Sequence, residues 1–408
     1  MTFLLRLTCM SLMGLIFLPH EPVRDMVHGL GGHSISKVSG LYEEKGQIAA
    51  RIDPGSQDPL LHKPELLEKG VTHARLATAI ESLNTESKAE RGLCWSEKGK
   101  PTVGDNKKKA DATSDRFTIE LEGLRKATVY HVRPYLVQGE KILYGEELAF
   151  TTDAFMNGIR IALRYVQGGS FTMGCTADPD VCYFDEIPVH EVEVESFQLS
   201  IYEITCAQFS AFINEGGINP DGTLGDQLYI DINDDDCPIR YAGRRFVPKP
   251  GMAEHPASEV SWQGAQAFCE WLGGTLPTEA EWEYAAKGGE KSRNYKYSGS
   301  NSLAEVAWFQ DNATGKSHPV GQKKPNELGL YDMSGNVWEW CYDWYAFEYY
   351  QDGPSQNPRG PETGDSRVIR GGAWNMDGWN CRISNRSSKE PQITYNYYGF
   401  RLLIPVQQ

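Results

Sequence analysis

Tryptophan is unevenly distributed in this chain of 408 residues, and its distribution restricts the folds that the chain can form. Nine of the ten tryptophans lie between Trp262 and Trp379, in a stretch that is also rich in glycine, proline and asparagine. Large aromatic side chains belong mostly in a core, whereas Gly, Pro and Asn favour turns and irregular backbone. The sequence therefore predicts a domain in which much irregular backbone is held by large buried side chains.

Cap signals predict three short helices in the second part of the chain. Ser261 and Thr205 each stand directly before an amphipathic run, and Thr278 forms a capping box with Glu281. The helix after Ser261 gathers four residues on one face, which predicts that its cysteine is a packed core thiol: Ala265, Phe268, Cys269 and Leu272.

The first part of the chain follows a different pattern. Between residues 71 and 153, short alternating runs such as HARLATAIES and DRFTIELEGL are separated by polar breaks about every dozen residues, which predicts an antiparallel sandwich. The stretches GLCWSEKGKPTVGDN and LEGLRKATVYHVRPYL resemble fibronectin type III modules, with Leu124 and Tyr130 at the corner where a tyrosine hydroxyl bonds back to the chain. The resemblance implies an all-β spacer or adhesion module over residues 61–153.

The N-terminus suggests export. Arg6 precedes an apolar run from Leu7 to Leu18, which is too short to cross a bilayer and suits the core of a signal peptide. We expect residues 1–19 to be a signal peptide, with a buried terminal strand as the alternative, and residues 20–60 to be a linker. The protein would then act in the periplasm or at the cell surface, and no later segment is apolar enough for a transmembrane helix.

The charge of the chain indicates which binding partners it favours, and its cysteines indicate where a disulfide could form. The net charge is -15, and the excess acid lies in the second part of the chain, so nucleic acid would be repelled while calcium or a cationic partner would be attracted. None of the nine cysteines forms a CxxC pair. Cys175 and Cys182 flank the polar stretch TADPDV and either close a small disulfide in an exported protein or remain free buried thiols.

A series of motifs in the second part carries a specific resemblance. GGSFTMGC, HPASEVSWQGAQAFCEWLGG, LPTEAEWEYAA, GLYDMSGNVWEW, RVIRGGAW and YYGFRLL follow one another in this order. Together they resemble the formylglycine-generating enzyme family, also called the sulfatase-modifying factor family. The resemblance implies one large α+β domain over residues 157–408, a variant of the C-type lectin fold with little regular structure.

The resemblance also bears on catalysis. Enzymes of this family oxidise a cysteine of sulfatases to formylglycine with oxygen and copper(I), and two cysteine thiolates that follow an RGGS element hold the soft ion. Here the element reads RGGAWNMDGWNC, with Ala373 in place of the serine and no cysteine pair after it. The sequence thus argues against copper and leaves no catalytic residue beyond a weak candidate, Cys381.

The alignment with the family assigns Cys381 to packing. It matches a structural cysteine whose disulfide partner would fall at Ala286, and Cys269 matches one whose partner would fall at Leu402. Each family disulfide is therefore half missing. A reactive Cys381 is the alternative, because Arg382 lies beside it and a cation lowers the pKa of a thiol.

The loop GLYDMSGNVWEW is expected to hold a structural calcium. The resemblance implies ligands at Asp332, Gly335, Val337 and Glu339, and carboxylates together with backbone carbonyls suit that ion. The alternative is a turn with solvated acids. A second family site offers one side-chain ligand here, Asn312.

Two function classes remain. The leading hypothesis is an exported two-domain protein that keeps the family scaffold without the copper oxidase and serves as a calcium-stabilised binding or structural module for a protein or glycan. Trp338 and Trp374 would line its groove, with Arg386 as an anchor. The alternative is a divergent formylglycine-generating oxidase that acts on sulfatase cysteines. The family resemblance favours an enzyme, whereas the missing cysteine pair favours a module without catalysis.

Overall fold

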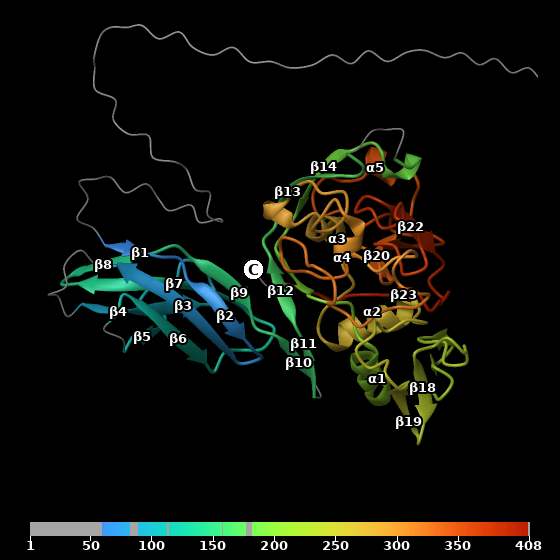
Figure 1. Cartoon of the computed structure of the whole chain (residues 1–408), viewed down its shortest axis with the longest axis horizontal. Helices are drawn as coiled ribbons and strands as arrows, with labels where there is room; N and C mark the ends of the chain where they lie inside the picture. Colours follow the sequence, from blue (N-terminus) through green and yellow to red (C-terminus); the bar gives the residue numbers. More distant parts are fainter. Residues whose placement is uncertain (1–58, 82–88, 112–113, 157, 177–181, 407–408) are drawn as a thin grey trace, which may run out of the picture. The chain divides into compact units, whose positions relative to one another are not determined.

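A computed structural model describes residues 59–81, 89–111, 114–156, 158–176 and 182–406 (Figure 1). The chain divides into two compact units, Met1–Ser56 and Gln57–Gln408, and the described residues all belong to the second. The expected signal peptide and nearly all of the expected linker lie outside the described residues. No helix in the described ranges is long and apolar enough to span a membrane.

Two antiparallel sheets with one shared core form the first part of the described chain. Its strands are β1 (Leu60–Leu61), β2 (Glu65–Lys69), β3 (His73–Glu81), β4 (Glu90–Ser96), β5 (Asn106–Lys109), β6 (Arg116–Glu122), β7 (Val129–Gln138), β8 (Lys141–Tyr144) and β9 (Leu148–Thr151). One sheet has the order β1–β3–β2 with β6 beside β3, and the other β5–β4–β7–β8 with β9 beside β7. Leu76 and Leu121 from the first sheet pack with Val132 from the second, which makes a sandwich.

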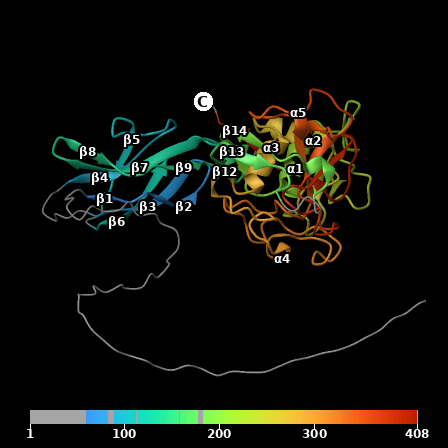
Figure 2. The ribbon, with the colours of Figure 1, turned by 90° about the horizontal axis from the view of Figure 1, so that it is seen from above.

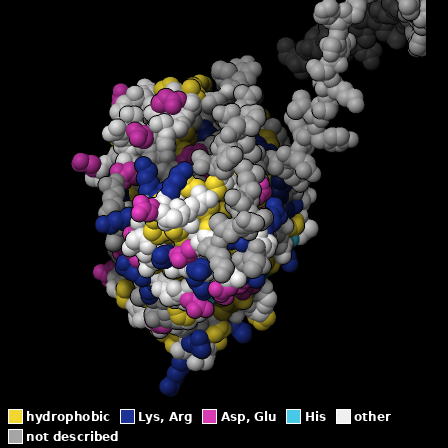
Figure 3. Space-filling view, turned by 90° about the vertical axis from the view of Figure 1, so that its left-hand side faces the viewer, with side chains coloured by type: hydrophobic (Ala, Val, Ile, Leu, Met, Phe, Trp, Pro, Cys, Tyr) yellow, Lys and Arg dark blue, Asp and Glu magenta, His cyan; other side chains and the backbone are white. Residues whose placement is uncertain are grey.

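The alternation predicted for the sandwich is clearest in the burial of β6. Strand β6 alternates between exposed and buried residues along its whole length. The hydroxyl of Tyr130 accepts a hydrogen bond from the backbone nitrogen of Arg125 at 2.9 Å, five positions upstream, and this bond fixes the corner before β7. On the face shown in Figure 3, acidic and basic side chains are interspersed, as is typical of solvent-exposed surfaces.

The second part is built from small sheets and short helices. Its strands are β10 (Ala154–Met156), β11 (Ile159–Ile161), β12 (Leu163–Val166), β13 (Gly169–Met173), β14 (His190–Val194), β15 (Phe197–Ser200), β16 (Thr223–Leu224), β17 (Gln227–Leu228), β18 (Ile239–Ala242), β19 (Arg245–Pro248), β20 (Trp338–Trp344), β21 (Arg367–Arg370), β22 (Arg386–Lys389), β23 (Tyr398–Gly399) and β24 (Leu403–Pro405). The larger sheets have the orders β12–β15–β24 and β22–β21–β20–β23, and the remaining strands pair as hairpins.

The three predicted helices are confirmed with their caps. Thr205 caps α1 (Cys206–Glu215), Ser261 caps α2 (Trp262–Trp271), and Thr278 caps α3 (Glu279–Ala286) through the predicted capping box with Glu281. Figure 2 shows α3 beside the hairpin β13–β14, which it contacts. The other helical segments are single turns: η2 (Phe184–Glu186), η3 (Gly289–Lys291), α4 (Leu303–Val306) and α5 (Tyr349–Asp352).

Strand β20 separates two cores. Trp338 and Trp340 point into a core that also holds Phe209 and Phe268, because alternate residues of a strand face opposite sides. Cys341 points the other way, into a core with Trp282. The predicted packing of large side chains against irregular backbone is thus confirmed, and the loop that precedes β20 lies between the two cores.

Candidate functional site

The loop before β20 is tightly turned and buried. Asp332, Gly335 and Asn336 have φ angles of 58°, 82° and 60°, in the left-handed region that permits such a turn. A Cβ at Gly335 would lie 2.3 Å from the carbonyl oxygen of Trp308, so only glycine fits there. The loop thereby presents its polar groups inward.

Asp332 has an oxygen without a partner. Its side chain is 2% exposed, and Oδ2 accepts a hydrogen bond from the backbone nitrogen of Gly321 at 2.7 Å. The other oxygen, Oδ1, is buried and has no hydrogen-bond partner. A buried carboxylate oxygen left in this way is costly, and it is the one feature of the loop that calls for a ligand.

Glu339 is held by the protein itself. Its carboxylate forms a two-pronged ion pair with Arg401, at 2.6 Å from Nε to Oε2 and 2.5 Å from Nη2 to Oε1. The indole nitrogen of Trp282 donates to Oε2 at 2.7 Å. Glu339 is therefore a charged neighbour of the loop whose oxygens are already engaged.

A third acid, Glu203, completes the loop's surroundings. It lies just before α1, is 1% exposed, and accepts hydrogen bonds from the side chain of Asn336 at 2.6 Å and the backbone nitrogen of Val337 at 3.2 Å. Burial, followed by the charges of Asp332 and Glu339, raises its pKa well above the ordinary value. Burial likewise raises the pKa of Asp332 to about 6.

The charges in this cluster do not balance. Glu203, Asp332 and Glu339 face the guanidinium of Arg401, with the half-buried Lys323 near Asp332, so full ionisation leaves an excess of negative charge in a buried place. Either protons or a divalent cation can remove that excess. The oxygens of the three acids are not close enough together to form a carboxylate cage, since the described residues hold such a grouping only at Cys175, Cys182 and Glu186.

The remaining predicted calcium residue, Asn312, closes a turn. Its side-chain oxygen accepts from the backbone nitrogen of Phe309 at 2.9 Å, and its amide nitrogen donates to the carbonyl of Ala307 at 3.0 Å. Both polar atoms of the Asn312 side chain therefore form hydrogen bonds within the turn.

Cys381 is packed away from solvent. The side chain is fully buried among Tyr297, Val306 and Ala307, and burial raises the pKa of the thiol to about 12. Arg382 does not offset this effect, because its guanidinium turns toward Glu186. The other free cysteines of the described ranges lie in the sandwich or in the two cores beside β20, apart from this cluster: Cys94, Cys206, Cys237, Cys269 and Cys341.

The predicted groove residues do not meet at an open surface. Trp338 is 3% exposed within a core, and Arg386 is 4% exposed. The Arg386 guanidinium pairs with Glu279 at 2.6 and 2.8 Å and lies 4.1 Å from the ring centre of Tyr350. Its contacts are therefore with other residues of the domain. Of the three, Trp374 alone is half-buried. The described residues therefore do not form a groove from this set.

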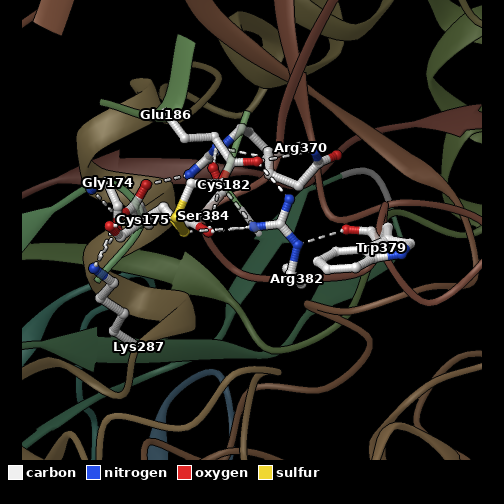
Figure 4. Close-up of a disulfide and its surroundings, with 11 residues drawn as sticks. Gly174, Cys175, Cys182, Glu186, Lys287, Arg370, Trp379, Arg382 and Ser384 are labelled. Carbon is white, nitrogen blue, oxygen red and sulfur yellow. Dashed lines mark hydrogen bonds and ion pairs between the residues drawn. A yellow bond between two sulfur atoms is a disulfide. The ribbon is translucent and has the colours of Figure 1, made fainter. Parts of the chain in front are cut away.

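Cys175 and Cys182 are joined in a disulfide, with an S–S distance of 2.02 Å (Figure 4). The bond lies beside an ion pair between Glu186 and Arg382, whose nitrogens are 2.6 and 2.7 Å from the two carboxylate oxygens. Nη1 of Arg382 also lies 3.7 Å from the sulfur of Cys175.

A second buried arginine extends this network. Arg370, at the end of β21, is fully buried and pairs with Glu283 of α3. Glu283 also binds Lys287 at 2.9 Å and accepts a hydrogen bond from the backbone nitrogen of Gly174, the residue before the disulfide. The network thereby ties α3 and β21 to the start of the disulfide loop.

The second part of the described chain matches a known protein family. The family model of the sulfatase-modifying factor enzyme 1-like domain matches residues 162–406, more than half of the chain. The chain belongs to the sulfatase-modifying factor family. The matched range contains the acidic cluster, Cys381 and the disulfide, and it excludes the sandwich.

Relatives of this family domain differ in what surrounds it. The serine/threonine-protein kinase pkn1 of Chlamydia pneumoniae is 36% identical over 239 residues, which make up 58% of this chain and 36% of that protein. The formylglycine-generating enzyme of Streptomyces coelicolor is 32% identical over 273 residues, 57% of this chain and 86% of that enzyme. The chain thus spans little more than a third of the length of the kinase-named relative.

A solved structure agrees with the family assignment. Treponema denticola variable protein 1 superposes with a TM-score of 0.50 and 26% identity, covering 62% of this chain and 98% of that one. The described family domain is accordingly mixed and rich in short strands, with few helices.

Proposed function

We propose that this chain is a binding or structural module of the sulfatase-modifying factor family that does not carry the copper oxidase chemistry. The observation that supports this proposal most directly is the environment of Cys381, a thiol enclosed by apolar side chains with its pKa raised. A copper(I) site needs two accessible thiolates that point at one another, and Cys381 offers one inaccessible thiol. The ligand would be a protein or a glycan.

The first test is a copper(I) titration of the anaerobically purified protein. We expect no tight stoichiometric binding in competition with a copper(I) chelator, and Cys381→Ser should leave the titration unchanged. Native Cys381 should also resist alkylation until the protein is unfolded. Stoichiometric binding that disappears in Cys381→Ser would establish the alternative, a divergent formylglycine-generating oxidase acting on sulfatase cysteines.

Calcium is part of the proposal, with a revised set of ligands. Asp332 Oδ1 would be a side-chain ligand, and the backbone carbonyls of Gly335 and Val337 would contribute. Glu339 would act through its charge, because Arg401 and Trp282 hold its oxygens. A divalent cation would neutralise the excess negative charge of the buried acids, and its role would be to stabilise the fold.

We also propose an architecture and a location for the protein. The sandwich would be a fibronectin type III-like module, supported by its two sheets and the Tyr130 corner. The family domain would be a C-type-lectin-like variant, supported by its small sheets and long irregular segments. Export to the periplasm or cell surface is supported by the N-terminal sequence and by the disulfide.

A further inference from the structure

We propose that Cys175–Cys182 is a thiol-exchange site: a thiol reductant attacks the sulfur of Cys182, and Cys175 leaves as a thiolate beside Arg382. The disulfide would then be a reversible modification site of the family domain, independent of the binding function proposed above.

The ends of the disulfide loop are anchored without the bond. The backbone nitrogen of Cys175 donates to the carbonyl of Glu186 at 3.0 Å, and Glu186 is fixed by Arg382. Gly174, the residue directly before Cys175, is held by Glu283 at 2.8 Å and by Lys287 at 3.3 Å. Because these contacts do not pass through the sulfurs, the bond can open while the surrounding fold stays closed.

The two cysteines differ in exposure. Cys175 is 5% exposed, whereas Cys182 is half-buried and precedes two exposed aromatic residues, Tyr183 and Phe184. The site at which an incoming thiolate attacks depends on which sulfur it can reach. Attack is therefore directed to Cys182, and Cys175 becomes the leaving group.

The leaving sulfur is next to a cation. Nη1 of Arg382 lies 3.7 Å from Cys175 Sγ and is aimed at it, as Figure 4 shows. The charged groups around this point are mixed, since Glu186 lies close to both sulfurs and opposes a thiolate. Glu186 and Glu283 face Arg370, Arg382 and Lys287, and the neighbouring Arg386 faces Glu279 and the buried Asp185, so the wider cluster carries no excess of positive charge. A cation in contact with the departing sulfur stabilises the thiolate that forms there, so the contact with Arg382 favours Cys175 as the leaving group.

The Cys175–Cys182 disulfide is reduced in two thiol-exchange steps. A reductant thiolate forms a bond to Cys182 Sγ, the S–S bond breaks, and its electron pair remains on Cys175 as a thiolate. A second reductant thiolate then attacks the reductant sulfur of the mixed disulfide and releases Cys182 as a thiolate, which takes a proton from water. The reductant is oxidised by two electrons and the protein disulfide is reduced by two.

The test exposes the full chain to reduced glutathione, quenches with acid, blocks free thiols with N-ethylmaleimide and maps adducts by peptide mass spectrometry. We expect early glutathione adducts on Cys182 at least ten-fold above those on Cys175. The buried free cysteines serve as an internal control and should stay unmodified: Cys94, Cys206, Cys237, Cys269, Cys341 and Cys381. Equal labelling of the two sulfurs, or adducts that form only together with labelling of the buried cysteines, would overturn the proposal.

Two variants separate the electrostatic role of Arg382 from a structural one. Arg382→Gln should slow reduction about ten-fold, and Glu186→Gln should speed it, because each removes a charge of opposite sign from the leaving sulfur. Arg245→Gln, which removes an exposed arginine, is the matched control and should change nothing. If the ion pair matters only for structure, both variants should change the rate of reduction in the same direction. That result would contradict an electrostatic role for Arg382.

Discussion

Arg370→Met is expected to lower the free energy of unfolding of the family domain by about 3–5 kcal/mol, the largest effect of any single change considered. The guanidinium of Arg370 is fully buried and holds three successive backbone carbonyls, those of Ile383, Ser384 and Asn385, at 2.7 to 3.0 Å. It also pairs with Glu283. Methionine keeps much of the apolar volume but leaves the carbonyls without donors and removes one of the cations that neutralise Glu283.

Chemical denaturation of the full chain, followed by tryptophan fluorescence, measures this effect. A loss of this size corresponds to a fall in Tm of roughly ten degrees for a domain of about 245 residues. Arg245→Met, at an exposed position of β19, is the matched control and should stay within about 0.5 kcal/mol of the parent protein. A change below about 1 kcal/mol in Arg370→Met would contradict the assignment of Arg370 as the central donor of this network.

Asp332→Asn is expected to abolish most of the stabilisation of the protein by calcium. Without calcium at pH 7.5, the variant should be more stable than the parent by up to about 3 kcal/mol, because the amide removes a buried charge whose pKa is raised from 3.8 to about 6. With calcium, the parent should gain about 2.7 kcal/mol at a hundred-fold excess over Kd, while the variant should gain little. The order of stabilities therefore crosses when calcium is added.

The pH dependence in chelator follows from the same shift. The folded-state pKa of Asp332 lies above its unfolded value, so the folded protein binds the proton more tightly. Its stabilising contribution is full below about pH 4 and is lost as the pH rises through about 6. Glu203 shifts in the same direction through its burial. Parent and Asp332→Asn should consequently have similar stability near pH 4 and diverge toward neutral pH.

Melting curves with chelator, calcium or magnesium, at several pH values, test both expectations. Magnesium should substitute poorly because it requires a smaller octahedral site. Asp226→Asn removes an exposed acid and should respond to calcium like the parent protein. If metal-free parent protein melts at the same temperature with chelator and with millimolar calcium, the loop before β20 is a packed turn and the calcium proposal fails.

Local signals in the sequence predicted the local structure well. The caps Thr205, Ser261 and Thr278 each act within one helical turn, and all three helices begin where these residues place them. Period-two alternation likewise predicted strands such as β6 and β7, because side chains on a strand face alternate sides regardless of what packs on them. These features depend on a few neighbouring residues and can be read directly.

Local signals could not predict which charged residues pair inside the family domain. Glu203 meets Asn336 across 133 positions, and Arg382 meets Glu186 across 196. Neither glutamate lies in a local pattern that predicts burial. The sequence predicted Arg386 as an anchor of the family groove, yet it is buried and pairs with Glu279. Because these partners are far apart in the sequence, a local pattern does not show which charged side chains will be buried together.

The central position of β15 between β12 and β24 has a consequence for biosynthesis. Leu199 pairs with Leu403, so the sheet needs a strand made roughly two hundred residues later, and contacts of such long range form slowly. During translation, the apolar face of Phe197–Ser200 stays without its last partner until residue 405 has left the ribosome. Early strands of this domain would therefore depend on a holding chaperone, and a premature stop a few codons before Leu403 should yield an aggregating polypeptide even though nearly all of the core residues have been made.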